Sequence, residues 1–152
     1  MITKDEIFSA QKKWANSLVE IGSLKENREN CEERTSEILK DLYAFESGDV
    51  LFKPTKASQV QFRKNFTAAK SYFIGGDEKY PEDKGFALEP WQDIRFENTW
   101  VVTDNNRALA MGNYYFKAPE KDEVKVEYTF SYVKNDEGDL KIDLHHSSLP
   151  YH

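Results

Sequence analysis

Cysteine is almost absent from this sequence, and the only one, Cys31, lies in a polar, charged stretch. No disulfide can form within the chain, so the fold does not depend on an oxidising compartment. No histidine stands near Cys31 in the sequence, which disfavours a role for its thiol as a catalytic nucleophile.

Long apolar runs are also missing, and none approaches the roughly 20 residues that a transmembrane helix needs. Residues 1–6 do not have the pattern of a signal peptide. We therefore expect a soluble protein with no targeting segment in this chain. The sequence does not identify the compartment. We expect the cytoplasm, or a plastid or the periplasm if a targeting segment has been removed.

Basic residues are outnumbered, with 21 Lys and Arg against 27 Asp and Glu, and the formal net charge is −6. A nucleic-acid partner needs clustered positive charge, so this balance argues against one. It argues equally against binding to an anionic membrane surface. We expect neither kind of partner.

Histidine, the commonest metal ligand, occurs only three times. His145 and His146 are adjacent, so on a strand they point to opposite faces, and His152 is the last residue. The sequence has no HxH or HxxE spacing. These features disfavour a three-histidine metal site, and we expect no bound metal cofactor.

Aromatic residues, by contrast, are abundant at 14% of the chain, and the expected helices precede the expected strands. Apolar spacing and caps predict helices at 3–22, 30–45 and 59–73, with Ser58 capping the third. Strands are expected at 50–52, 94–102, 108–117, 124–133 and 140–149, with a polar loop at 77–90. This order favours the α+β class. It is the order of an NTF2-like cone, in which N-terminal helices pack on a strongly curved antiparallel sheet, and we expect residues 1–152 to form one domain.

The last expected strand alternates in polarity. Its even-numbered positions from 140 to 144 are apolar, and the odd-numbered positions between them are charged. Because side chains alternate across a strand, the even face is expected to point into the cone. This predicts that His146 and Ser148 lie inside and that His145 and Ser147 lie outside. The inward pair fits the lining of a polar pocket, and it equally fits a His and a Ser satisfied by neighbours at a strand end.

The strand at 124–133 carries an apolar and aromatic stripe on one face, from Val124 to Tyr132. Such a stripe is more often core or subunit interface than a substrate pocket. In cone folds the outer face of the sheet often packs on a second subunit. We therefore expect a homodimer through the outer sheet face.

Several segments resemble one enzyme family. The run HHSSLP at 145–150 is similar to the signature of iota-class carbonic anhydrases, a family that looks like the association domain of calmodulin-dependent kinase II. The other segments that look like this family are LFKPTKA at 51–57, SYFIGG at 71–76, EDKGFA at 82–87, AMGNYYF at 110–116 and VEYTF at 126–130. HHSS alone would be a weak match, but the ordered set, which spans residues 50 to 151, is specific.

The resemblance implies reversible hydration of CO2 to bicarbonate at a metal-free site, where a Thr, a Tyr, a Ser and a His hold a water or bicarbonate. These roles fall on Thr55, Tyr72, Ser148 and His146. His146 is then the candidate proton acceptor, and the three hydroxyls orient the water and donate to the developing bicarbonate. Some bacterial relatives are described as metal-dependent, so the resemblance leaves a metal requirement open.

Two other functions fit the same fold, because fold alone does not fix function. One is a different small-molecule lyase or isomerase, for which we would expect a roomy pocket with a deep Asp or Glu. The other is a non-catalytic association module, for which we would expect a filled cavity and no CO2 hydration.

Overall fold

The first two helices begin at well-defined capping residues. The computed structural model describes all 152 residues, with α1 at Lys4–Ser23 and α2 at Arg28–Leu42. A capping box starts α1, since Thr3 Oγ1 accepts from the backbone N–H of Glu6 at 3.1 Å and Glu6 Oε1 accepts from that of Thr3 at 3.0 Å. Both predicted helices are confirmed with slightly different bounds, and a short 3-10 helix, η1 at Ala44–Glu46, follows α2.

The third helix is shorter than predicted, and Ser58 does not cap it. It spans Phe66–Ile74 as α3, and Asn65 caps it by accepting from the backbone N–H of Ala68 at 2.9 Å. Residues 59–65 form a loop, because side chains, and not the hydrogen bonds of a helix, provide partners for backbone N–H and C=O groups there. The Glu82 carboxylate accepts from the backbone N–H groups of residues 58–60, and Arg63 Nε donates to a carbonyl of the same loop at 2.8 Å.

Five strands form one open sheet in the order β1-β5-β4-β3-β2. They are β1 at Leu51–Lys53, β2 at Asp93–Thr103, β3 at Arg107–Lys117, β4 at Val124–Lys134 and β5 at Leu140–Ser148. All neighbours are antiparallel except β1, which pairs in parallel with β5, so the sheet is antiparallel apart from this short edge strand. A second 3-10 helix, η2 at Phe86–Leu88, lies within the predicted loop 77–90.

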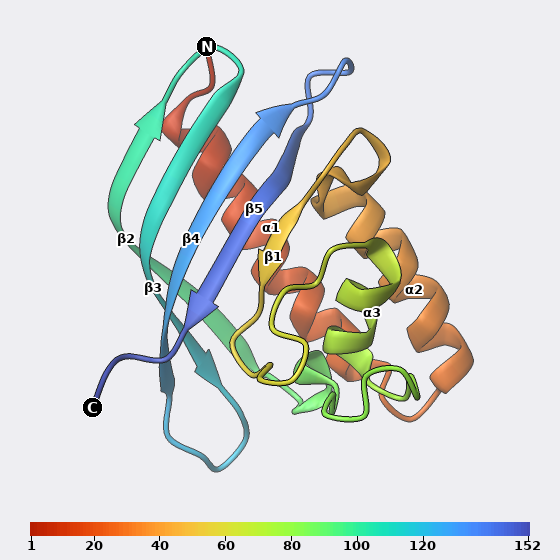
Figure 1. Cartoon of the computed structure of the whole chain (residues 1–152). Coiled ribbons are helices and arrows are strands. Elements are labelled where there is room, and N and C mark those ends of the chain that lie inside the picture. The colour runs from red at the N-terminus through yellow and green to blue at the C-terminus, as the bar shows by residue number, and fades with distance from the viewer.

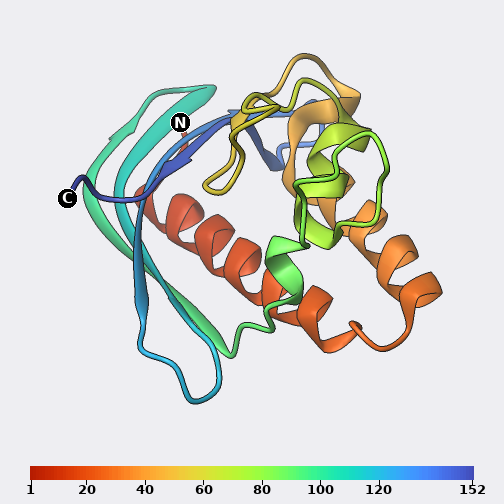
Figure 2. The same cartoon turned by 60° about the horizontal axis from the view of Figure 1, so that its bottom comes forward.

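The sheet curves around α1. Figure 1 shows the strands passing in front of this helix, and Figure 2 shows it within the hollow of the sheet, with α2 and α3 to one side. The N-terminus lies against the β2–β3 turn, where the backbone N–H of Ile2 donates to the carbonyl of Asp104 at 3.0 Å. The α+β fold is confirmed, and its concave side is covered by helices.

One core lies between α1 and the concave face of the sheet, and 31 buried residues belong to it. Trp14 of α1 packs against the rings of Phe96, Tyr114, Phe116 and Phe130, with centroids 5.6–6.2 Å away. Burying each side chain of this size stabilises the fold by roughly 1.5–3 kcal/mol. The aromatic stripe of β4 faces this core.

A β-bulge in β5 overturns the predicted orientation of His146 and Ser148. Ser131 of β4 pairs with Leu144, whereas the next residue of β4 pairs with Ile142, so Asp143 is an extra residue in β5. An extra residue shifts every side chain beyond it to the opposite face. The predicted orientation is therefore wrong: His145 is 2% exposed and Ser147 1% exposed on the concave side, whereas His146 is exposed on the outer face.

Charged and polar side chains hold this bulge in place. Arg107 Nη1 donates to the Asp143 carboxylate at 2.8 Å and to Ser131 Oγ at 2.6 Å. The three residues belong to β3, β5 and β4, so the bulge is fixed by contacts across the sheet. The alternation of polar and apolar residues in β5 therefore does not predict the bulge.

Candidate functional site

His145 lies in a buried aromatic pocket. Its ring stacks on that of Phe52 with centroids 4.9 Å apart and meets the ring of Phe130 at 4.4 Å. Burial lowers the pKa of His145 well below its usual value, and the neighbouring His146 adds a smaller effect in the same direction. His145 is therefore a neutral imidazole, with one N–H donor and one free lone pair.

Two tyrosine hydroxyls lie against the two ring nitrogens of His145. The Tyr43 hydroxyl, just after α2, is 2.8 Å from Nδ1, and the Tyr114 hydroxyl of β3 is 3.1 Å from Nε2. Trp14 Nε1 donates to the Tyr43 oxygen at 3.0 Å. Burial raises the pKa of both tyrosines, so both hydroxyls keep their protons.

Ser147 and Thr55 extend this arrangement towards the loop after β1. The Tyr114 hydroxyl shares a hydrogen bond of 2.5 Å with Ser147 Oγ, which shares one of 2.6 Å with Thr55 Oγ1. Ser147 is buried and Thr55 is half-buried. A continuous chain of hydrogen bonds therefore runs from the imidazole of His145 to the hydroxyl of Thr55.

Tyr72 brings a further hydroxyl to the same threonine. Its oxygen accepts from the backbone N–H of Lys56 at 3.1 Å. Burial raises the pKa of Tyr72, and the hydrogen bond from that N–H and the nearby Thr55 hydroxyl oppose the rise. Thr55 acts in the same opposing direction on the pKa of Tyr114. The hydroxyls of Tyr72, Tyr114 and Ser147 therefore gather around Thr55.

Of the four site residues expected from the sequence, the structure brings two together. Thr55 and Tyr72 lie side by side, but their partner from β5 is Ser147. Ser148 Oγ donates to Glu127 Oε1 at 2.8 Å on the other face of the sheet. His146 is exposed on that outer face.

Sequence reasoning missed four members of the cluster: Tyr43, Tyr114, His145 and Ser147. The last two belong to the HHSS run, and the bulge alone decides which of its residues point inward. Tyr114 lies in the AMGNYYF segment, so the resemblance carried a signal for it. No motif pointed to Tyr43, because its contact with His145 depends on the direction that the chain takes after α2.

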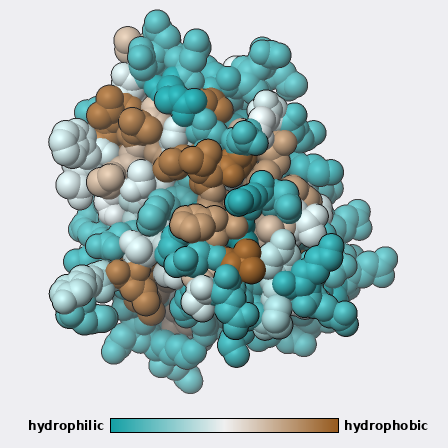
Figure 3. Space-filling view, in the orientation of Figure 1, coloured by the Kyte–Doolittle hydropathy of each residue, from teal (hydrophilic) through white to brown (hydrophobic).

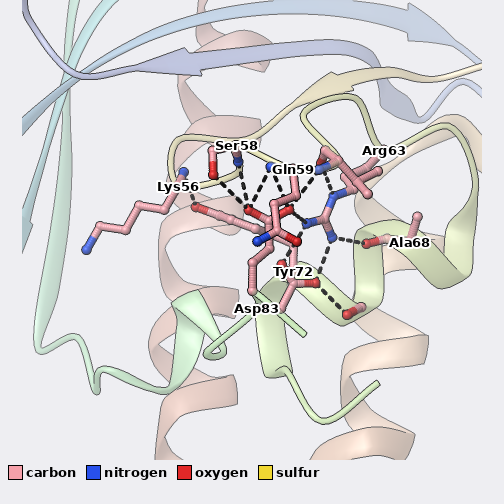
Figure 4. A network of polar contacts seen from close by, with 10 residues as sticks. Lys56, Ser58, Gln59, Arg63, Ala68, Tyr72 and Asp83 are labelled. Atoms are coloured by element: carbon pink, nitrogen blue, oxygen red, sulfur yellow. Dashed lines mark hydrogen bonds and ion pairs between the residues drawn. The ribbon is translucent and has the colours of Figure 1, made fainter. Parts of the chain in front are cut away.

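A buried ion pair holds the loop that carries Thr55 (Figure 4). The side chains of Arg63 and Asp83 are both 0% exposed, and two hydrogen bonds of 2.6 and 2.7 Å join them. Ser71 Oγ of α3 donates to the same carboxylate at 2.5 Å. Beside them, hydrogen bonds from the loop backbone lower the pKa of Glu82 to about 2. The loop is thus fixed to the segment before η2 and to α3, the helix of Tyr72.

A pocket of about 410 Å³ lies against Tyr72. Its exposed cations are Lys25, Lys56 and Lys84. Each carboxylate of the pocket has a partner that offsets its negative charge. Asp83 pairs with the buried Arg63, Glu82 accepts from backbone N–H groups, and Glu89 lies 2.7 Å from Lys121. The uncompensated charge beside Tyr72 is therefore positive, which attracts small anions.

The structure shows neither a metal-binding cluster nor a membrane-spanning helix. No group of three or more His, Cys, Asp or Glu side chains is placed so that it could hold a metal ion. No helix is both long and apolar enough to cross a membrane.

Comparison with known proteins points to one family. The sequence model of the metal-independent carbonic anhydrases matches residues 5–149. A protein described as a metal-independent carbonic anhydrase from Nostoc sp. strain PCC 7120 is 37% identical over 153 residues, which cover 99% of this chain and 75% of that protein.

Solved structures agree on the architecture. The chain is similar to the crystal structure of an iota-carbonic anhydrase from a cyanobacterium, complexed with bicarbonate, with a TM-score of 0.95, 36% identity and coverage of 99% of this chain and 94% of the other. An NTF2-like superfamily protein from Salmonella enterica shares the fold alone, with a TM-score of 0.58, 12% identity and coverage of 98% and 92%. The predicted NTF2-like architecture is confirmed.

Proposed function

The chain belongs to the family of metal-independent carbonic anhydrases, and we propose that it interconverts CO2 and bicarbonate at the hydroxyl cluster around Thr55. The observation that carries this proposal is the continuous hydrogen-bond chain from His145 through Tyr114 and Ser147 to Thr55. We propose Thr55, Tyr72 and Ser147 as the groups that contact bicarbonate, and His145 as the inner end of the chain.

The cluster suits a bicarbonate ion. Hydroxyl groups can donate to its oxygens, and burial keeps the protons on Tyr72 and Tyr114 by raising the pKa of each. Donors fixed in a site with little water stabilise developing negative charge more than mobile water does.

Hydration requires that a proton leave the attacking water. As the new C–O bond forms, we propose that the water proton passes to Thr55 while the Thr55 proton moves to Ser147, the Ser147 proton to Tyr114 and the Tyr114 proton to Nε2 of His145. Nε2 can accept it only in the tautomer of His145 that carries its own proton on Nδ1. One proton enters this chain and one reaches the imidazole, so each hydroxyl is restored. Because its pKa is lowered, His145 then returns the proton readily along the same hydroxyls to Thr55, the half-buried outer end of the chain.

Stopped-flow CO2 hydration, with and without a chelator, tests this function. We expect hydration well above the buffer rate, and we expect the rate to be unchanged after dialysis against the chelator, because no step of the proposed chain uses a metal. A rate equal to that of buffer would reject the enzymatic function. A rate lost on chelation and restored by zinc would reject the metal-free site.

We further propose that residues 1–152 act as one domain that pairs with a second copy through the outer face of the sheet. Trp100 pairs with Met111 and Val102 with Leu109, and all four are exposed on that face. Figure 3 shows apolar patches on this side of the molecule. Analytical ultracentrifugation should give the mass of two chains, and Trp100→Lys should lower it to one. A wild-type mass of one chain would contradict the pairing.

A further inference from the structure

The Tyr43 hydroxyl has two hydrogen-bond partners, and their chemistry fixes where its proton lies. Trp14 Nε1 can only donate, so the Tyr43 oxygen accepts that bond. The Tyr43 proton is then left with Nδ1 of His145 as its acceptor. If Nδ1 carried the imidazole proton instead, the buried Tyr43 proton would have no acceptor, which is unfavourable. The neutral His145 therefore carries its proton on Nε2.

This tautomer sets the direction of every hydrogen bond that follows. Nε2–H donates to the Tyr114 oxygen, so the Tyr114 proton points to Ser147 Oγ. The Ser147 proton in turn points to Thr55 Oγ1. The proton of Thr55, or that of Tyr72 beside it, is left for a ligand. The resting site thus presents a hydroxyl donor at the end of the chain, which suits an oxygen of an anion.

We infer that Tyr43, held by Trp14, is a positioning residue that fixes the tautomer of His145 and thereby orients the hydroxyl chain so that it ends in a donor for bicarbonate. The inference rests on the proposed function only for the identity of the anion. Accepting a proton from water requires the other tautomer of His145, with Nε2 unprotonated and every hydrogen bond of the chain reversed. Tyr43 therefore sets the balance between holding bicarbonate and accepting a proton.

The tautomer is directly measurable by NMR of the wild-type protein labelled with 15N. Long-range correlations between ring nitrogens and ring protons distinguish a protonated nitrogen from one with a free lone pair. The chain has three histidines, and His146→Gln assigns one of them without touching the cluster. We expect His145 to show an unprotonated Nδ1 and a protonated Nε2. A protonated Nδ1 in the resting enzyme would overturn the inference.

Tyr43→Phe removes the hydroxyl that selects this tautomer. We expect the ring-nitrogen signals of His145 to move towards a mixture of the two tautomers. Bicarbonate should then inhibit CO2 hydration about fivefold more weakly, and kcat should also change, because the tautomer of His145 that accepts a proton becomes more populated. Tyr132→Phe is the matched control, because Tyr132 is another buried tyrosine and its hydroxyl has no hydrogen-bond partner.

The outcomes separate this inference from the proposed function. Wild-type signals for His145 in Tyr43→Phe would reject Tyr43 as the positioning residue, even with full activity. The expected tautomer in a protein without CO2 hydration would keep the inference and reject the function. A Tyr132→Phe variant that shifts the His145 signals as much as Tyr43→Phe would show a general packing effect and overturn the specific role.

Discussion

Replacing Ser147 with alanine is expected to lower kcat for CO2 hydration by about 100-fold or more. Ser147 Oγ lies between the Tyr114 hydroxyl at 2.5 Å and Thr55 Oγ1 at 2.6 Å, so its removal separates Thr55 from His145. The change deletes one buried oxygen and leaves the side chain nearly the same size. Loss of activity would therefore reflect the hydrogen-bond chain and not the packing.

Ser148→Ala is the matched control, because the neighbouring serine projects from the opposite face of β5. Its hydroxyl contacts Glu127 and no member of the hydroxyl cluster. Stopped-flow hydration by this variant should stay within about twofold of the wild-type rate, since changes at the surface away from a site are usually small. The assignment of the site to the concave face fails if Ser148→Ala is the inactive variant or if Ser147→Ala keeps full activity.

Replacing Arg63 with methionine is expected to lower the free energy of unfolding by about 3–5 kcal/mol. The change leaves the Asp83 carboxylate fully buried without its cation, although Ser71 still donates to it. It also removes the bond from Arg63 Nη1 to the carbonyl of Ala68 at 3.0 Å. Urea denaturation, followed by circular dichroism, measures the difference.

Arg34→Met provides the comparison on the surface. Arg34 pairs with Glu20 at 2.5 Å, but both side chains are 43% exposed. Water screens such a pair, so we expect its loss to cost about 0–1 kcal/mol. If Arg63→Met costs no more than Arg34→Met, then the buried pair does not hold the loop, and the position of Thr55 needs another explanation.

The loop, the buried pair and the site are physically linked. Arg63 and Glu82 fix residues 58–63, which continue directly from Thr55 and Lys56. The Lys56 backbone in turn donates to the Tyr72 hydroxyl. The hydroxyl cluster is therefore assembled from a loop, a helix and two strands, and its precision depends on polar contacts outside it.

Much of the fold could be predicted from the sequence, because caps and hydrophobic spacing are local signals. Thr3 and Glu6 marked the start of α1, and the strand bounds followed from alternation and turn residues. The third helix was overpredicted, because Glu82, which binds the backbone N–H groups of residues 58–60, comes from a later loop of the chain. A local pattern cannot register such partners.

The site was predicted in part, for a related reason. Thr55 and Tyr72 were found through the resemblance. Thr55 does meet an inward side chain of the last strand, and Tyr72 lies against the backbone of the residue after Thr55. Which side chains those are depends on one extra residue, Asp143, held by Arg107 from β3. Strand alternation assumes a regular ladder, so it placed His146 and Ser148 where the structure has His145 and Ser147. Register is a property of paired strands, and one strand alone does not reveal it.

A crystal structure of this protein with bound bicarbonate tests the central claim most directly. We expect bicarbonate on the concave side of the sheet, with its oxygens within hydrogen-bonding distance of the hydroxyls of Thr55, Tyr72 and Ser147. His145 should remain hydrogen-bonded to Tyr43 and Tyr114. Bicarbonate bound at His146 and Ser148 on the outer face, with the concave hydroxyls bonded only to each other, would contradict it.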